Sequence, residues 1–125
     1  MSKLLGLNNM KKLIARLFLP VLLMSASQHA VALDATRCIF LSKAYALHLQ
    51  SPETLNQSQA FDAAFFLGYV AGFVGAERSL ILPRESTLAQ WADIVGRYAQ
   101  QHPEFHDRSR AECAYRALTE AFQQT

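Results

Sequence analysis

The residues whose side chains could best take part in catalysis or metal binding lie in one short polar segment near the C-terminus. His102 and His106 are four positions apart, and Glu104 and Asp107 stand beside them. Two imidazoles at this spacing can share a helix face, which is the minimum for a metal pair, but a zinc site takes at least three protein ligands. No third ligand with a convincing spacing accompanies the pair. We therefore expect neither a metal nor a cofactor.

Motifs that would carry catalysis are missing from the sequence. It has no Gly-x-Ser-x-Gly nucleophile elbow and no phosphate-binding loop. The glycines at positions 68, 72 and 75 lie inside an apolar run and not at a strand-to-helix turn. Acidic residues such as Glu77 and Asp93 stand alone in the sequence. We therefore expect a protein without enzymatic activity.

The N-terminus has the pattern of an export signal. Basic residues precede an apolar run over residues 17–24, and Ala30-Val31-Ala32 offers the small-x-small pattern of a cleavage site. We expect residues 1–32 to be a signal peptide that is removed. The remaining residues, 33–125, are then one domain in the periplasm. Both Met1 and Met10 are candidates for the first residue of the protein.

Removal of the signal changes the charge of the protein. Four of the 12 basic side chains and none of the 10 acidic ones lie in the expected signal, so the net charge changes from +2 to about −2. The remaining Lys and Arg residues are dispersed among acids and form no basic stripe of the kind that binds nucleic acid. We expect no nucleic-acid partner, and no membrane association after cleavage.

Two cysteines, Cys38 and Cys113, lie in the expected mature chain. Disulfides form and persist in the compartments that exported proteins enter. A bridge between these cysteines would close a loop of 74 intervening residues and stabilise the fold by about 4 kcal/mol on the chain-entropy model. The sequence predicts this disulfide, and two isolated buried thiols are the alternative.

Apolar periodicity predicts an all-α fold, a small bundle of four helices or at most five. Capping boxes at Thr87-x-x-Gln90 and Ser109-x-x-Glu112 predict two helix starts, and prolines after the preceding helices predict the ends. The expected helices span residues 34–50, residues 59–78, a segment from Thr87 to just before Pro103, and a segment from Ser109 towards the C-terminus. Nothing in the sequence predicts a sheet.

The most apolar segment, residues 65–75, is predicted to be the central helix. Its small residues form one stripe on a helical wheel and its aromatic residues the next arc, so no face is left for water. Three interior glycines cost roughly 3 kcal/mol relative to alanine. We therefore expect another helix to pack against Gly68, Gly72 and Gly75, within one subunit or across a dimer.

Further core residues follow from the helical spacing. Tyr69 is assigned to the packing of the central helix and Trp91 to the buried face of the third helix. In the last helix the shared face comprises Ala111, Ala114, Tyr115, Leu118, Ala121 and Phe122, with Cys113 at its edge or beyond. A membrane span is not predicted, because the uncharged run over residues 63–76 is shorter than the about 20 residues a span needs.

Four short motifs follow one another in an order that resembles a known family. They are Gly68-Tyr69-Val70-Ala71-Gly72, then Leu82-Pro83 ahead of Thr87-x-x-Gln90, then Ile94-Val95 and Tyr98 before His102-Pro103-Glu104, then Ala117-Leu118 with Ala121-Phe122. This succession, over about residues 61–122, resembles the Rap/Tai family of immunity proteins. Many relatives carry a cysteine beside the Gly-Tyr pair and another before the Leu-Pro pair, where this chain has none. The chain therefore resembles a divergent member.

The resemblance implies a function. Members of that family are small exported helical proteins, often dimeric, that protect a bacterium from peptidoglycan amidases delivered into the periplasm by type VI secretion. A loop or helix end covers the catalytic cysteine-histidine cleft of the amidase. By this resemblance we expect a homodimer that binds and occludes such an amidase without catalysis. The candidate contacts are Glu77, Arg78, Arg84 and Glu85 in one connection, and His102, Glu104, His106 and Asp107 in the next.

A second class of function is consistent with the same features. Small periplasmic chaperones or stress proteins of the acid-activated type also have one disulfide and a dimer interface of apolar helix surface. The four histidines and the nearly balanced charge argue weakly against an acid switch. Suppression of client aggregation at low pH, without inhibition of an amidase, would favour the chaperone.

Overall fold

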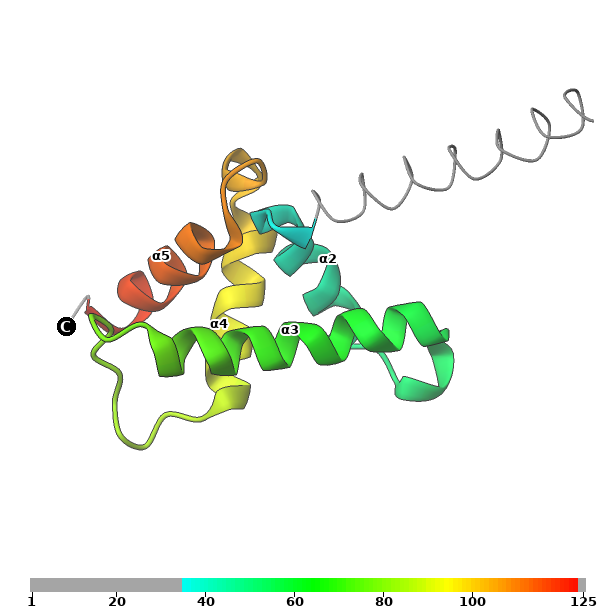
Figure 1. Cartoon of the computed structure of the whole chain (residues 1–125), viewed down its shortest axis with the longest axis horizontal. Coiled ribbons are helices and arrows are strands. Elements are labelled where there is room, and N and C mark those ends of the chain that lie inside the picture. Colours follow the sequence, from blue (N-terminus) through cyan, green and yellow to red (C-terminus); the bar gives the residue numbers. More distant parts are fainter. Residues whose placement is uncertain (1–34, 124–125) are drawn as a thin grey trace, which may run out of the picture. The chain divides into compact units, whose positions relative to one another are not determined.

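The computed structural model describes residues 35–123, which are mostly helical (Figure 1). In chain order the elements are α2 (Cys38–His48), η1 (Pro52–Thr54), α3 (Gln57–Ala76), α4 (Leu88–Gln101), η2 (Pro103–Phe105) and α5 (Arg110–Gln123). These four α-helices confirm the predicted all-α class. The predicted signal peptide, residues 1–32, lies outside the described residues.

Local sequence signals set two of the helix starts. Thr87 Oγ1 accepts the N–H of Gln90 at 3.3 Å, and Gln90 Oε1 accepts the N–H of Thr87 at 3.0 Å, which confirms the predicted capping box of α4. Asn56 and Gln59 form the same reciprocal pair at the start of α3, with distances of 2.9 and 3.0 Å. This second box explains why α3 begins slightly earlier than predicted.

The first described helix begins later than the predicted start at residue 34. Arg37 has an extended backbone and pairs with Ser109 in an isolated antiparallel bridge. The N–H of Cys38 donates to the carbonyl of Arg108 at 2.8 Å. Backbone groups at the N-terminal end of α2 are thus used by the chain between α4 and α5, and a helical turn there would remove these hydrogen bonds.

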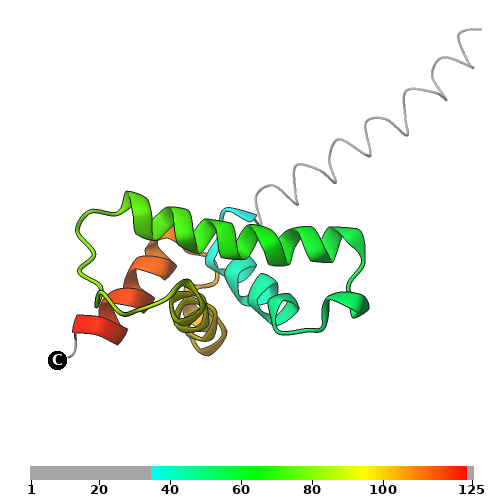
Figure 2. The same ribbon diagram turned by 90° about the horizontal axis from the view of Figure 1, so that it is seen from below.

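The core lies where the four helices meet (Figure 2). Each contributes at least one fully buried large side chain: Leu41 from α2, Phe66 and Val70 from α3, Val95 from α4, and Leu118 from α5. Burial of one such side chain stabilises the fold by about 1.5–3 kcal/mol. This common core holds both ends of α4, and hence the connections that precede and follow it.

The predicted disulfide is present. The Sγ atoms of Cys38 and Cys113 are 2.05 Å apart and the Cα atoms 5.6 Å apart, so the bridge joins the start of α2 to the first turn of α5. Both cysteines are buried, at 0% and 1% exposed. The expected position of Cys113 at the edge of the core is therefore wrong.

The buried face of α5 is rotated from the predicted one. Ala111, Tyr115 and Ala121 are exposed, although their periodicity assigns them to the core. The disulfide holds the side of α5 that carries Cys113 against α2, so that side turns inward. The residues actually buried are Cys113, Ala114, Ala117 and Leu118.

One close approach sets how α2 meets α4. The ring of Tyr45 lies against the backbone of Gly96 so closely that a Cβ at position 96 would overlap its carbon atoms. The Tyr45 hydroxyl donates to the Asp93 carboxylate, which also accepts from Arg97 Nε at 3.1 Å. Burial, together with this carboxylate, raises the pKa of Tyr45 above its ordinary value. Asp93 therefore serves the α2–α4 contact.

The helix α3 lies on the surface of the bundle (Figures 1 and 2). Its only buried residues are Ala63, Phe66 and Val70. The glycines at 68, 72 and 75 are exposed, and a Cβ at any of them would meet nothing within 4 Å. The expectation that α3 leaves no face for water is therefore wrong for residues 35–123, and no element of this part packs against the glycine stripe.

By length and composition alone, α3 is the one helix in the described part of the chain that could cross a membrane. Its 20 residues exceed the uncharged run because the helix also includes the polar stretch from Gln57 to Asp62. Phe66 and Val70 pack into the common core from one side of α3. The helix is thus part of the folded domain and presents its other side to the surroundings.

Candidate functional site

The residues expected to contact a partner fall at opposite ends of α4. Glu77, Arg78, Arg84 and Glu85 precede it, in the connection over residues 77–87, and the others follow it, in the connection over residues 102–109. The 14 residues of α4 span about 21 Å, and Figure 1 shows the two connections far apart. The structure therefore divides the predicted residues into two separate surfaces.

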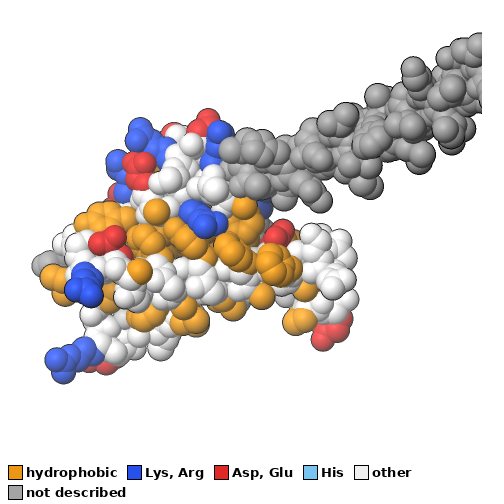
Figure 3. Space-filling view, viewed as in Figure 1, with side chains coloured by type: hydrophobic (Ala, Val, Ile, Leu, Met, Phe, Trp, Pro, Cys, Tyr) orange, Lys and Arg blue, Asp and Glu red, His pale blue; other side chains and the backbone are white. Residues whose placement is uncertain are grey.

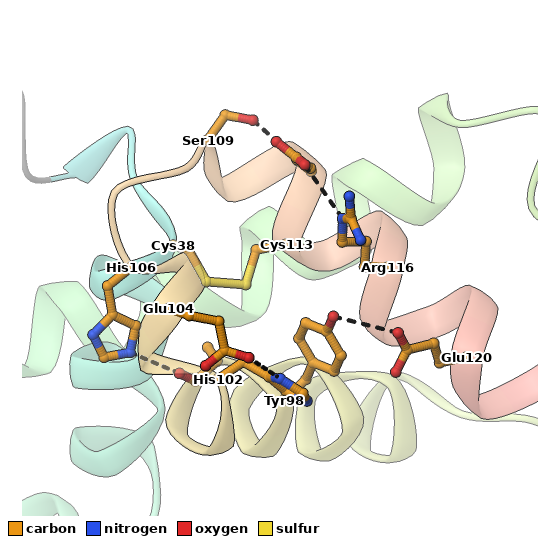
Figure 4. The surroundings of a disulfide bond; sticks show 11 residues. Cys38, Tyr98, His102, Glu104, His106, Ser109, Cys113, Arg116 and Glu120 are labelled. Atoms are coloured by element: carbon orange, nitrogen blue, oxygen red, sulfur yellow. Dashed lines mark hydrogen bonds and ion pairs between the residues drawn. A yellow bond between two sulfur atoms is a disulfide. The ribbon is translucent and has the colours of Figure 1, made fainter.

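Stacked rings and charges form the centre of the α4–α5 connection (Figure 4). The ring of His102 stacks on that of Tyr98, with centroids 4.1 Å apart, and Phe105 lies parallel to Tyr98 at 6.1 Å. His102 Nδ1 lies 2.8 Å from Glu104 Oε1. This hydrogen bond, more than any other contact, lowers the pKa of Glu104 below its usual value. The carboxylate is thus held in its charged form.

His106 and Asp107 face other partners. His106 Nε2 lies 2.8 Å from the carbonyl of Ala99 near the end of α4, so the imidazole fixes the connection to that helix (Figure 4). The Asp107 side chain is 95% exposed and lies 3.4 Å from Arg37. Among the described residues, no group of three His, Cys, Asp or Glu side chains could hold a metal ion.

The backbone of this connection is tied to the start of α2. The amide of Ile39 donates to the carbonyl of His106 at 3.2 Å, and the amide of Cys38 to that of Arg108 at 2.8 Å. The Cys38–Cys113 disulfide joins the same end of α2 to the first turn of α5 (Figure 4). The connection is therefore anchored by α2, by α4 through His106, and by the first turn of α5.

Sequence reasoning missed two arginines around Phe105. The guanidinium of Arg108 lies 5.7 Å from the Phe105 ring centroid and that of Arg116 lies 4.9 Å from it, both within cation–π range. Both arginines pair with Glu112, at 3.1 and 3.2 Å. The spacing of four between Glu112 and Arg116 predicts their pairing within α5, because residues four apart are neighbours on a helix, but no spacing in the sequence predicts the contacts with Phe105.

A polar groove of about 260 Å³ extends this surface between α4 and α5. The Tyr98 hydroxyl donates to Glu120 Oε1 across it at 3.5 Å. Burial, and next the negative charge of Glu120, raise the pKa of Tyr98, so the hydroxyl keeps its proton at neutral pH. The groove is lined by Ile94, Arg97, Tyr98, Gln101, His102, Ala117, Glu120 and Ala121.

The α3–α4 connection is anchored at both ends. Glu77 Oε1 accepts the Ser79 hydroxyl at 2.7 Å. At the other end the Ser86 hydroxyl donates to the carbonyl of Pro83 at 2.6 Å and accepts the indole N–H of Trp91 at 2.9 Å. Trp91 is partly buried against the core, as predicted, and its N–H has the partner it needs.

Between these anchors the connection is exposed. Leu80 and Leu82 are partly buried against the core, whereas Ile81 between them is 78% exposed. Arg84 and Glu85 are exposed and form no hydrogen bond or ion pair with the described residues. The middle of this connection thus presents one apolar and two charged side chains to the surroundings.

Aromatic rings and one arginine lie against each other on a side of α3, and Figure 3 shows hydrophobic side chains with a basic one among them along this helix. The guanidinium of Arg110 lies 4.6 Å from the Tyr69 ring centroid and 5.3 Å from that of Phe65. Burial raises the pKa of Tyr69, and Arg110 opposes the shift. Arg110 also donates to the carbonyl of Ala35 at 2.8 Å. Tyr69 is partly buried against the core.

The part of the chain that contains the helices and both connections matches the profile of a known protein family. A profile described as Rap1a immunity proteins matches residues 31–123, a range that contains every described helix. No curated protein and no solved structure matches the chain significantly. Because the profile covers most of the chain, the protein belongs to the Rap1a immunity protein family.

Proposed function

We propose that this protein is a non-catalytic immunity protein of the periplasm that binds and occludes a peptidoglycan amidase delivered by type VI secretion. Membership of the Rap1a immunity family supports the protective role. The Cys38–Cys113 disulfide fits an oxidising compartment such as the periplasm, and the expected signal peptide fits export to it.

We assign the contact with the amidase to the α4–α5 connection. The observation that carries this assignment is its anchoring on three sides, by the backbone bonds to α2, by His106 on Ala99, and by the disulfide. A segment that is already ordered loses little entropy on binding. It can therefore enter a cleft at a smaller cost than a flexible loop.

The chemistry of the connection fits occlusion. Phe105 with Arg108 and Arg116 offers the aromatic and arginine side chains that dominate protein interfaces. The ionisable groups nearby are engaged within the chain, His102 with Glu104 and His106 with a carbonyl. In this proposal they shape a surface that fills the cleft and excludes the substrate, and they perform no proton transfer.

Charge reversal at the two ends of α4 tests the assignment. Glu104→Arg alters the α4–α5 connection, and Arg84→Glu is the matched control at the other end. With a candidate type VI peptidoglycan amidase as the titrant, calorimetry should show about 30-fold weaker binding for Glu104→Arg, the size of a hot-spot loss. Asp107→Arg, at a 95% exposed side chain, changes the charge of the same surface and leaves the contact between His102 and Glu104 in place.

The control outcome decides between the two surfaces. Arg84→Glu should bind within about threefold of the wild type, and circular dichroism should show all three variants folded. If Arg84→Glu weakens binding and both changes at the α4–α5 connection do not, the contact lies at the α3–α4 connection instead.

We also propose that the protein is a homodimer. The support is the exposed side of α3, where three glycines have open space around them and Phe61 is 67% exposed. Exposed apolar surface along one whole helix is unusual in a monomer. A second chain on this side would supply the packing that the described chain does not.

A further inference from the structure

We propose that, in this homodimer, Ile81 of each chain enters an apolar groove at the N-terminal end of the other chain's α3. The two α3 helices then pair antiparallel, related by a two-fold axis. This inference rests on the proposed homodimer and names the surfaces that hold it together. It is independent of the α4–α5 connection that we assign to the amidase.

The groove lies between the end of α2, η1 and the first half of α3. It has a volume of about 180 Å³ and is lined mainly by aliphatic side chains, with His48 and Gln50 among the others. A pocket of this kind accepts an aliphatic side chain and leaves few polar groups without partners. Its principal apolar residues are Leu47, Leu55, Ala60, Ala64 and Leu67.

Ile81 is a side chain of the matching kind. It is 78% exposed, while Leu80 and Leu82 on either side pack against the core. The bonds from Ser79 to Glu77 and from Ser86 to Pro83 hold the loop on both sides of it. The isoleucine is thus presented outward by an anchored loop, as a side chain that inserts into a partner must be.

The groove and Ile81 lie at opposite ends of one helix. Small, exposed residues at helical spacing lie along the middle of this side of α3 between them: Ala64, Gly68, Ala71, Gly72 and Gly75. A two-fold axis at Gly68 places Ala64 of one chain opposite Gly72 of the other. The same axis brings the C-terminal end of each α3, with Ile81 beyond it, to the groove of the other chain.

The area of contact shows why both ends are needed. The 20 residues of α3 are about 30 Å long, and a strip about 12 Å wide along such a helix covers roughly 360 Å² per chain. A stable interface buries about 800 Å² per partner. The helices alone are therefore too small an interface, and the two Ile81 contacts must supply much of the rest.

The charged residues of α3 favour a second chain over a lipid surface as the partner that covers its exposed side. An amphipathic helix that lies on a membrane carries Lys and Arg on its polar side, and α3 carries neither. Its single charged residue is Asp62. In the antiparallel pair the two Asp62 side chains lie towards opposite ends, so no like charges meet. Figure 3 shows hydrophobic side chains on both sides of the uncharged strip along α3.

The first test measures mass by sedimentation on protein purified from the periplasm. Ile81→Asp and Gly72→Leu should each raise the dimer dissociation constant at least about tenfold, and Ala111→Leu, at an exposed site of α5, should not change it. Gly72→Leu should remain fully folded, because a Cβ there meets nothing within 4 Å. A monomeric wild type, or variants that dimerise normally, would overturn the inference.

The second test is a covalent one. Gly68 lies at the axis, so Gly68→Cys places two thiols within the Cα separation of about 4.4–6.8 Å that a disulfide spans. Under mild oxidation this variant should form a cross-linked dimer far faster than the control Ala111→Cys. Equal rates would overturn the antiparallel arrangement, as would a monomer that binds phosphatidylglycerol vesicles through Ile81.

Inhibition of the amidase is measured on the same preparations. If Ile81→Asp is monomeric yet inhibits the amidase, the immunity function stands and the dimer inference is supported. If no variant alters the mass while inhibition is intact, only the dimer inference fails. The two proposals are thus tested separately.

Discussion

Loss of the Cys38–Cys113 disulfide should cost about 4.5 kcal/mol of the free energy of unfolding. The bridge spans a sequence separation of 75 residues, and the chain-entropy relation for a loop of this length gives that value at 25 °C. Domains have only about 5–15 kcal/mol in total. Removal of the bridge therefore brings this protein close to the limit of stability.

The assay is urea unfolding followed by circular dichroism, with and without a reductant. The double variant Cys38→Ala/Cys113→Ala provides a second measurement that does not depend on the reductant. It should be at least as unstable as the reduced wild type, because both cysteines are buried in the core and their replacement also loses packing. The unfolding slope should rise, because an open chain exposes more surface than a cross-linked one.

A local effect should accompany the global one. The amides of Cys38 and Ile39 donate to carbonyls of the α4–α5 connection, and the disulfide lies beside these bonds. Hydrogen exchange at both amides should therefore accelerate on reduction more than exchange at the amide of Val95 in the core of α4. A stability loss below about 1 kcal/mol would refute the reasoning that the bridge acts by restricting the unfolded chain.

Two further predictions concern single residues. Gly96→Ala should destabilise the fold by about 3 kcal/mol or more in urea unfolding, because the new methyl group overlaps the ring of Tyr45. Gly75→Ala, where the space is open, should be neutral or stabilising by up to about 1 kcal/mol. Equal effects of the two substitutions would contradict the packing described. The lowered pKa of Glu104 means that its stabilising contribution is complete above the ordinary value of about 4.3 and is lost as the pH falls through the lowered folded value. Glu104→Gln should therefore flatten the fall in melting temperature in that acid range, and an unchanged pH profile would show that the pairing with His102 is not formed.

The existence of the helices and the start of α4 could be predicted from the sequence because they depend on neighbouring residues. The capping box of Thr87 and Gln90 acts across one turn, and the structure contains it. The disulfide also followed from the sequence, since only two cysteines are present. Features that depend on residues close in the chain, or on a single possible cysteine pairing, could therefore be predicted from the sequence.

The surroundings of each helix could not be predicted in the same way. Apolar composition shows that α3 avoids water but not whether its own chain covers it, and the glycine stripe is in fact open. In α5 the alanines fit more than one face, and the disulfide decides which face turns inward. These outcomes depend on how distant elements pack.

The candidate site was predicted in part. The resemblance to the immunity family pointed to the residues of both connections together, and their division into two surfaces depends on α4 lying between the connections. The arginines around Phe105 were missed because the fold, not the sequence order, brings Arg108 and Arg116 to one ring.

The central claim is tested most directly by titrating this protein into the peptidoglycan amidase that it is proposed to bind, while peptidoglycan hydrolysis is measured. Occlusion by a tight complex predicts that activity falls linearly and ends at one immunity chain per amidase. Hydrolysis that continues at a large excess of this protein would contradict the proposal. So would complete loss of activity at a small fraction of an equivalent, because that result requires turnover by this protein and not binding.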